Sequence, residues 1–109
     1  PEGKQRMTIW IVEGSTGEYS DHHEWIAGCY THEDTAKEHV VKATAWARAN
    51  GISGDHDRRG DYNTVSDYYN DRPTNPYDPT MSVSYTGVYY TCYPLRVSEA
   101  AEPHAYLPV

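Results

Sequence analysis

The chain has 109 residues, of which 16 are acidic and 9 are basic, so its formal net charge is −7. This length fits one small domain and is too short for two. The acidity disfavours direct binding to nucleic acid or to an anionic membrane and favours partners with basic surfaces. Phe is absent, while eleven Tyr and three Trp supply the aromatic side chains. Such a composition is typical of binding surfaces, because Tyr covers apolar area and keeps a hydroxyl for hydrogen bonding.

The cysteines and the termini suggest where the protein resides. Cys29 and Cys92 form neither a CxxC motif nor a metal-type spacing. We expect reduced thiols in a cytoplasmic protein, although a disulfide between the two stays open if their strands are adjacent. No segment approaches the roughly 20 apolar residues of a membrane span. Residues 1–6 are polar and precede Met7, which is typical of a disordered start or a cloning remnant.

Two short apolar segments open the domain. Residues 8–12 (TIWIV) and residues 24–30 (EWIAGCY) are each rich in apolar or β-branched side chains, which predicts two buried strands. Cys29 is expected to be buried in the second one. The polar residues between the strands predict a long hairpin loop.

A helix is predicted over residues 32–49. Thr31 and Asp34 have the spacing of a helix-start motif, in which a hydroxyl is followed three residues later by an acid. Apolar residues then recur on one helical face, including Ala36, Ala43 and Ala47. The dipeptide Asn50-Gly51 predicts the end of the helix.

A long polar loop and two further strands complete the predicted chain. Residues 53–80 are dense in Asp, Asn, Gly and Pro, and a loop of this length is uncommon unless it is functional or disordered. Residues 81–85 and 88–97 are predicted strands, and Pro94 indicates an edge position or a strand end. The second strand is expected to alternate between two faces, one with Tyr90, Cys92 and Pro94 and the other with Tyr89, Thr91, Tyr93 and Leu95. Residues 98–109 are a predicted C-terminal tail.

This order of elements predicts an α+β domain of two layers over residues 7–97. A small antiparallel sheet of three to four strands would carry one long helix packed on one face, because both elements must bury an apolar side.

The front half of the chain resembles small domains of unknown function from phages and bacteria. The segment IWIVEGSTGEYSDHHEWIAGCYTHEDTAKEHV has their order of apolar strand, polar hairpin, second strand and acidic helix start, and YTGVYYTCYPL is similar to their Tyr-rich closing strand. The resemblance implies a ββαβ-type domain of phage origin and carries no site residue. The insertion at residues 53–80 departs from the shorter connection of those domains.

Residues 13–25 (EGSTGEYSDHHEW) combine residue types found in phosphate loops, metal sites and catalytic triads. A phosphate site is disfavoured, because Glu13 and Glu18 would repel phosphate and the segment leads into a strand instead of a helix. No HExxH motif or Cys/His cluster indicates a metal. A triad depends on the geometry of the fold, and no G-x-S-x-G elbow is present. We therefore expect a hairpin tip, with no cofactor and no metal.

The remaining signal is a set of acids interleaved with tyrosines, which together form a predicted partner-binding surface. Acids steer a basic partner and tyrosines bury area at low entropic cost. The predicted contact residues are Asp55, Asp57, Asp61, Tyr62, Asp67, Tyr68, Tyr69, Asp71, Tyr77 and Asp78, helped by Glu13, Glu18 and Asp21.

These features predict a protein-binding module without catalytic activity. We expect a phage accessory protein or an anti-CRISPR-like counter-defence inhibitor that occupies a basic surface of a host protein in the host cytoplasm. Two alternatives stay open. One is a small hydrolase or metal-dependent enzyme that uses the 13–25 hairpin. The other is a homo-oligomeric structural protein, for instance a homodimer, with the last strand as an exposed edge.

Overall fold

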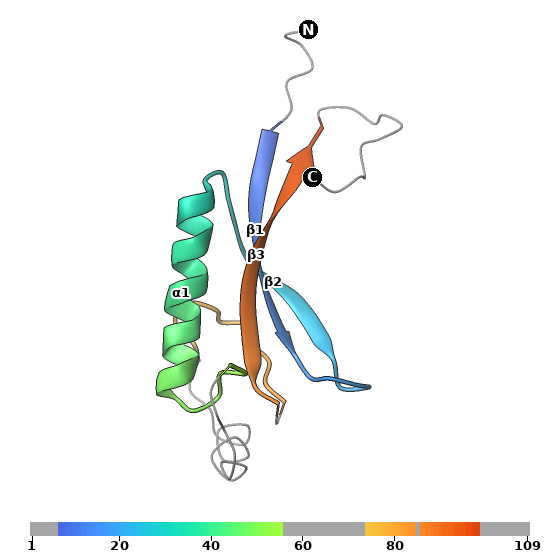
Figure 1. The fold of residues 1–109 in the computed structure, drawn as a ribbon, viewed down its shortest axis with the longest axis vertical. Coiled ribbons are helices and arrows are strands. Elements are labelled where there is room, and N and C mark those ends of the chain that lie inside the picture. The colour runs from blue at the N-terminus through green and yellow to red at the C-terminus, as the bar shows by residue number, and fades with distance from the viewer. Residues whose placement is uncertain (1–6, 56–73, 85, 99–109) are drawn as a thin grey trace, which may run out of the picture.

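The structure is a computed structural model, and it describes residues 7–55, 74–84 and 86–98. Three strands, β1 (Met7–Thr16), β2 (His23–Tyr30) and β3 (Val88–Val97), form an antiparallel sheet in the order β2-β1-β3. The helix α1 (Glu33–Ala49) lies along one face of this sheet (Figure 1). The predicted two-layer α+β fold is therefore confirmed.

The strand β1 is central and longer than predicted. It pairs with β3 along its whole length, from Met7 with Val97 to Thr16 with Val88. This pairing draws Glu13, predicted to lie in the hairpin loop, into the strand, where the register with β2 shifts at Val12/Glu13. The β1–β2 loop is thus confined to residues 17–22, shorter than the predicted loop.

The helix α1 covers the predicted residues, but the predicted motif does not cap it. The N-cap is His32, with no side-chain capping hydrogen bond, so the expected role of the Thr31 hydroxyl is wrong. Glu33 and Asp34 in the first turn and Arg48 in the last turn still complement the helix dipole. The position of α1 on the sheet therefore depends on packing more than on its cap.

Small side chains let α1 lie close to the sheet. Ala36, Ala43 and Ala47 are fully buried on the face of α1 that meets the strands. Gly28 of β2 provides space in the same way, because a Cβ there would lie 2.8 Å from Nδ1 of His39. The helix and the sheet therefore approach each other closely along this contact.

The segment at residues 81–84 is part of the core and not a strand, which corrects the strand predicted for 81–85; Tyr85 lies outside the described residues. Met81 and Val83 are 5% and 1% exposed, and they form the core with Ala47, Ile52 and Val88. Met81 and Val83 are buried alternately because their side chains pack between the end of α1 and the sheet. This was indistinguishable from a strand pattern in the sequence, because both bury every second residue.

The strand β3 is an edge strand, as Pro94 predicts. Its outer row of backbone groups starts at Val88, whose N–H donates to the Ile52 carbonyl and whose carbonyl accepts from the Gly54 N–H, at 2.9 and 2.8 Å. Every second residue after Val88 points the same way, and Pro94 belongs to this row because its pairing with β1 is regular. A proline there costs no ladder hydrogen bond with β1 and removes a donor from the free edge.

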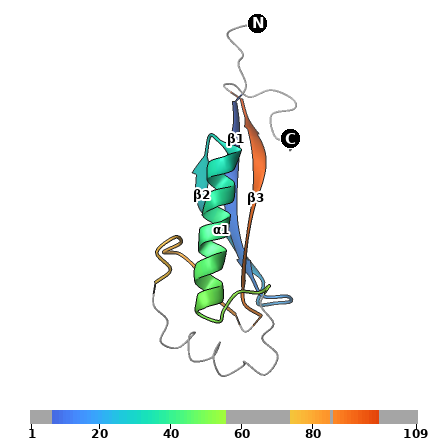
Figure 2. The ribbon, with the colours of Figure 1, turned by 60° about the vertical axis from the view of Figure 1, so that its left-hand side comes forward.

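The sheet has one face covered by α1 and one face that no described helix or strand covers (Figures 1 and 2). We call the second one the open face. Strand register assigns to it Met7, Ile9, Ile11, Glu13 and Ser15 of β1, Glu24, Ile26 and Cys29 of β2, and Tyr89, Thr91, Tyr93, Leu95 and Val97 of β3. In β3 the predicted alternation of two faces is confirmed by the burial pattern.

Candidate functional site

The thirteen predicted contact residues do not form one described surface. Seven of them lie outside the described residues: Asp57, Asp61, Tyr62, Asp67, Tyr68, Tyr69 and Asp71. The other six occupy separate places, on the open face (Glu13), at the hairpin tip (Glu18 and Asp21), after the helix (Asp55) and in the 74–84 segment (Tyr77 and Asp78).

Asp78, one of the predicted partner contacts, is only 1% exposed and makes its contacts within the chain. Its carboxylate accepts hydrogen bonds from Trp25 Nε1 at 2.8 Å, from the Tyr90 hydroxyl at 2.7 Å and from the Thr80 hydroxyl at 3.0 Å. Gly14 makes this possible, since a Cβ there would lie 2.5 Å from the Trp25 ring. Asp78 therefore fastens the 74–84 segment to the sheet.

Asp55 has its charge compensated within the chain. Its carboxylate lies 2.6 Å from the Arg48 guanidinium and also accepts a hydrogen bond from the Ser53 hydroxyl. The hydrogen bond from Arg48 and, after it, that from Ser53 lower the pKa of Asp55 below its usual value. Because a partner's cation would have to compete with Arg48, Asp55 is a weaker contact than the sequence suggests.

The hairpin tip presents its acids to solvent. Glu18 and Asp21 are exposed, and Asp21 Oδ1 accepts a 3.3 Å hydrogen bond from the Tyr19 N–H. His22 Nδ1 lies 3.1 Å from the Gly17 carbonyl and Nε2 lies 3.4 Å from Glu24, contacts that raise the pKa of His22. Both ring nitrogens of His22 are engaged in this way, and neither contact is with a serine hydroxyl.

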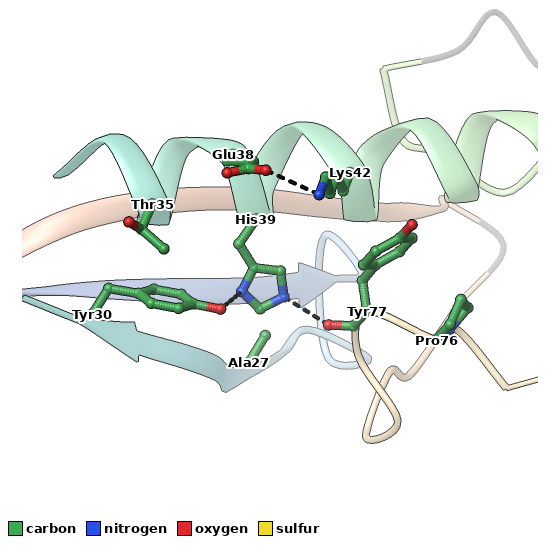
Figure 3. Close-up of a pocket in the computed structure, with 8 residues that line it drawn as sticks. All are labelled: Ala27, Tyr30, Thr35, Glu38, His39, Lys42, Pro76 and Tyr77. Atoms are coloured by element: carbon green, nitrogen blue, oxygen red, sulfur yellow. Dashed lines mark hydrogen bonds and ion pairs between the residues drawn. The ribbon is translucent and has the colours of Figure 1, made fainter. Parts of the chain in front are cut away.

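A hollow of about 480 Å³ lies between α1, β2 and residues 76–77 (Figure 3). His39 forms its floor, and Nε2 donates to the Tyr77 carbonyl at 2.6 Å while Nδ1 pairs with the Tyr30 hydroxyl at 3.0 Å. On its rim, Lys42 is 2.9 Å from Glu38. Since the imidazole nitrogens and the two rim charges are already paired, this hollow offers a ligand few unpaired polar groups.

The open face carries large apolar and aromatic side chains. Ile26 is 63% exposed, Tyr89 is 50% exposed, and Tyr93 and Leu95 are 37% and 38% exposed. Cys29 is exposed as well, which corrects its predicted burial; both cysteines are free thiols. The two cysteines lie on the two strands that flank β1, and the central strand separates them.

Acidic groups lie among these apolar side chains. Burial first, and then the charges of Glu13 and Glu24, raise the pKa of Tyr93, so both carboxylates act on its hydroxyl. In the register, Glu13 pairs with Ile26 on one side and with Thr91 on the other. Sequence reasoning named Glu13 but assigned it to the loop, and it missed the rest of this face. The alternation of Tyr89, Tyr93 and Leu95 was the available signal.

No protein-family model matches the chain, and neither a curated protein nor a solved structure matches it. Within the described ranges no three His, Cys, Asp or Glu side chains are grouped so as to hold a metal ion. Over those same ranges, no helix has the length and apolar character needed to cross a membrane.

Proposed function

We propose that this chain is a non-enzymatic protein-binding module whose partner has a basic surface. The observation that carries the proposal is the open face. Ile26, Tyr93 and Leu95 are exposed there, whereas the other face of the sheet packs against α1. Large apolar and aromatic groups exposed on one face mark interaction sites on many proteins. The net charge of −7 steers a basic partner toward such a surface.

The finer proposal follows from the sequence. Its resemblance to phage domains favours an accessory protein or an anti-CRISPR-like inhibitor that acts in the host cytoplasm. In this proposal Asp61, Asp67 and Asp71, together with the tyrosines near them, add acidic contacts to those at the hairpin tip. Tyrosine and carboxylate together suit a partner that presents Lys or Arg beside apolar side chains.

Affinity capture tests this proposal. The tagged chain is incubated with bacterial host lysate at near-physiological salt, beside a D61N/D67N/D71N variant. We expect a basic protein to be retained by the wild type and reduced with the variant. The purified partner should then bind more weakly as salt concentration rises, because salt screens the charge contacts. Absence of any retained protein contradicts the binding function, and equal recovery by both chains contradicts the role of the three acids.

A further inference from the structure

The apolar part of the open face is unlike an ordinary polar sheet surface. A sheet with one solvated face normally alternates apolar residues inside with polar residues outside. Here Met7, Ile26, Leu95 and Val97 are 52%, 63%, 38% and 36% exposed on the outer face. These side chains come from all three strands: Ile26 lies in register with Glu13 and Thr91, and Leu95 and the Met7–Val97 pair lie further along the same face.

The Asp, Glu, Lys and Arg charge on this face has one sign, and Glu24 also lies 3.4 Å from His22 Nε2. Glu13 and Glu24 lie on it, and both act on Tyr93. The Lys and Arg residues in the described part of the chain lie elsewhere. Lys37, Lys42 and Arg48 are on α1, and the register places Arg96 on the helix side of β3. A second copy stacked on this face would bring carboxylates toward carboxylates, whereas a partner with Lys or Arg would neutralise them.

The edge of β3 disfavours the other common way in which a sheet binds a chain. Adding a strand to this edge requires a row of outward donors and acceptors. Val88 already uses both of its groups on Ile52 and Gly54, and Pro94 has no N–H to give. Binding at this side of the molecule therefore depends on the side chains of the face and not on the backbone of the β3 edge.

We propose that the open face is the contact surface for a protein segment that carries apolar side chains next to Lys or Arg. The apolar side chains cover Ile26 and Leu95, and the cations pair with Glu13 and Glu24. This inference rests on the proposed binding function and specifies which surface performs it and which partner chemistry it accepts.

A peptide titration tests the inference without an identified partner. The probe is a synthetic peptide of roughly 12 alternating Leu and Lys residues, and the control peptide replaces Lys by Glu. We expect NMR shift changes at the open-face residues with the Lys peptide and none with the Glu peptide. The E13Q/E24Q variant should bind the Lys peptide about tenfold more weakly.

A second variant separates local charge from net charge. E33Q/E38Q removes two acids from α1, on the other side of the molecule, and we expect it to bind almost as the wild type does. An equal loss of affinity in both variants, or shift changes confined to the helix side, would overturn the inference. So would a species of twice the 12.4 kDa chain mass in light scattering that reverts to single chains in I26S/L95S, since a second copy would then occupy the face. Circular dichroism confirms that each variant is folded.

The outcome for the proposed function is read separately. If the captured host protein binds the I26S/L95S variant as tightly as the wild type and fails to bind the D61N/D67N/D71N variant, the open-face inference is wrong. In that case the binding function remains. If host lysate yields no partner, the proposed function fails, whatever the peptide result.

Discussion

Replacing Asp78 by Ala should destabilise the fold strongly. Asp78 is 1% exposed and accepts hydrogen bonds from Trp25, Tyr90 and Thr80. The exposed Thr80 hydroxyl turns to water in the variant, but the Trp25 and Tyr90 donors are partly buried and lose the carboxylate of Asp78 as an acceptor. A hydrogen bond to a charged group contributes about 1.5–3 kcal/mol, so two of them predict a loss of roughly 3–6 kcal/mol in the free energy of unfolding. Domains of this size have about 5–15 kcal/mol in total.

Urea unfolding followed by far-UV circular dichroism measures this loss, and two variants sharpen it. Asp78→Asn keeps an amide oxygen for Trp25 and Tyr90, and its amide N–H₂ can donate to the Thr80 hydroxyl, so we expect a loss of only about 1–2 kcal/mol. Tyr90→Phe removes one donor and should cost a similar amount. A loss below about 1 kcal/mol for Asp78→Ala would refute the reasoning, because it would mean that water replaces the carboxylate without penalty.

Three further predictions concern turns and exposed ion pairs. Gly87→Ala should destabilise by about 2 kcal/mol in urea unfolding, since φ is +89° and the new Cβ would lie 2.8 Å from backbone atoms of residues 52–54; an unchanged midpoint contradicts this. The pKa of Asp55 is lowered from 3.8 by Arg48, so its stabilisation is present above that pH and is lost as pH falls through the folded value; Asp55→Asn should flatten this acid decline by a fraction of a kcal/mol. His22 has a raised pKa, so its contribution is present below pH 6.5 and is lost as pH rises through the folded value; Glu24→Gln should lower the NMR titration midpoint of His22, and an unmoved midpoint would exclude Glu24 as a cause.

The elements with regular burial could be predicted from the sequence. The periodic Ala36, Ala43 and Ala47 gave the helix correctly, and the alternation at residues 88–97 gave β3 and its two faces. Pro94 indicated the edge, because a proline is compatible with only one side of a strand. These patterns depend on residues close together in the sequence, so they can be recognised without knowledge of the tertiary contacts.

The candidate site depends on contacts distant in sequence. Asp78 is one more acid in a polar loop until Trp25 is placed beside it, and nothing near residue 78 specifies that indole. In the same way, Glu13 became a strand residue because β3 pairs with all of β1. Burial of Met81 and Val83 imitates a strand for a similar reason. The sequence alone does not show which loop residues pack against the sheet.

The central position of β1 has a consequence for the order of folding. The hairpin of β1 and β2 with α1 is contiguous in sequence and can form from local contacts, whereas β3 closes the sheet across nearly the whole described chain, as Met7 pairs with Val97. Such non-local pairing is slow, because chain entropy is lost before contacts compensate it. Until β3 pairs with β1, one edge of β1, which contains the segment TIWIV, has no partner strand. Aggregation during refolding should therefore begin at the strand that is best protected in the finished protein.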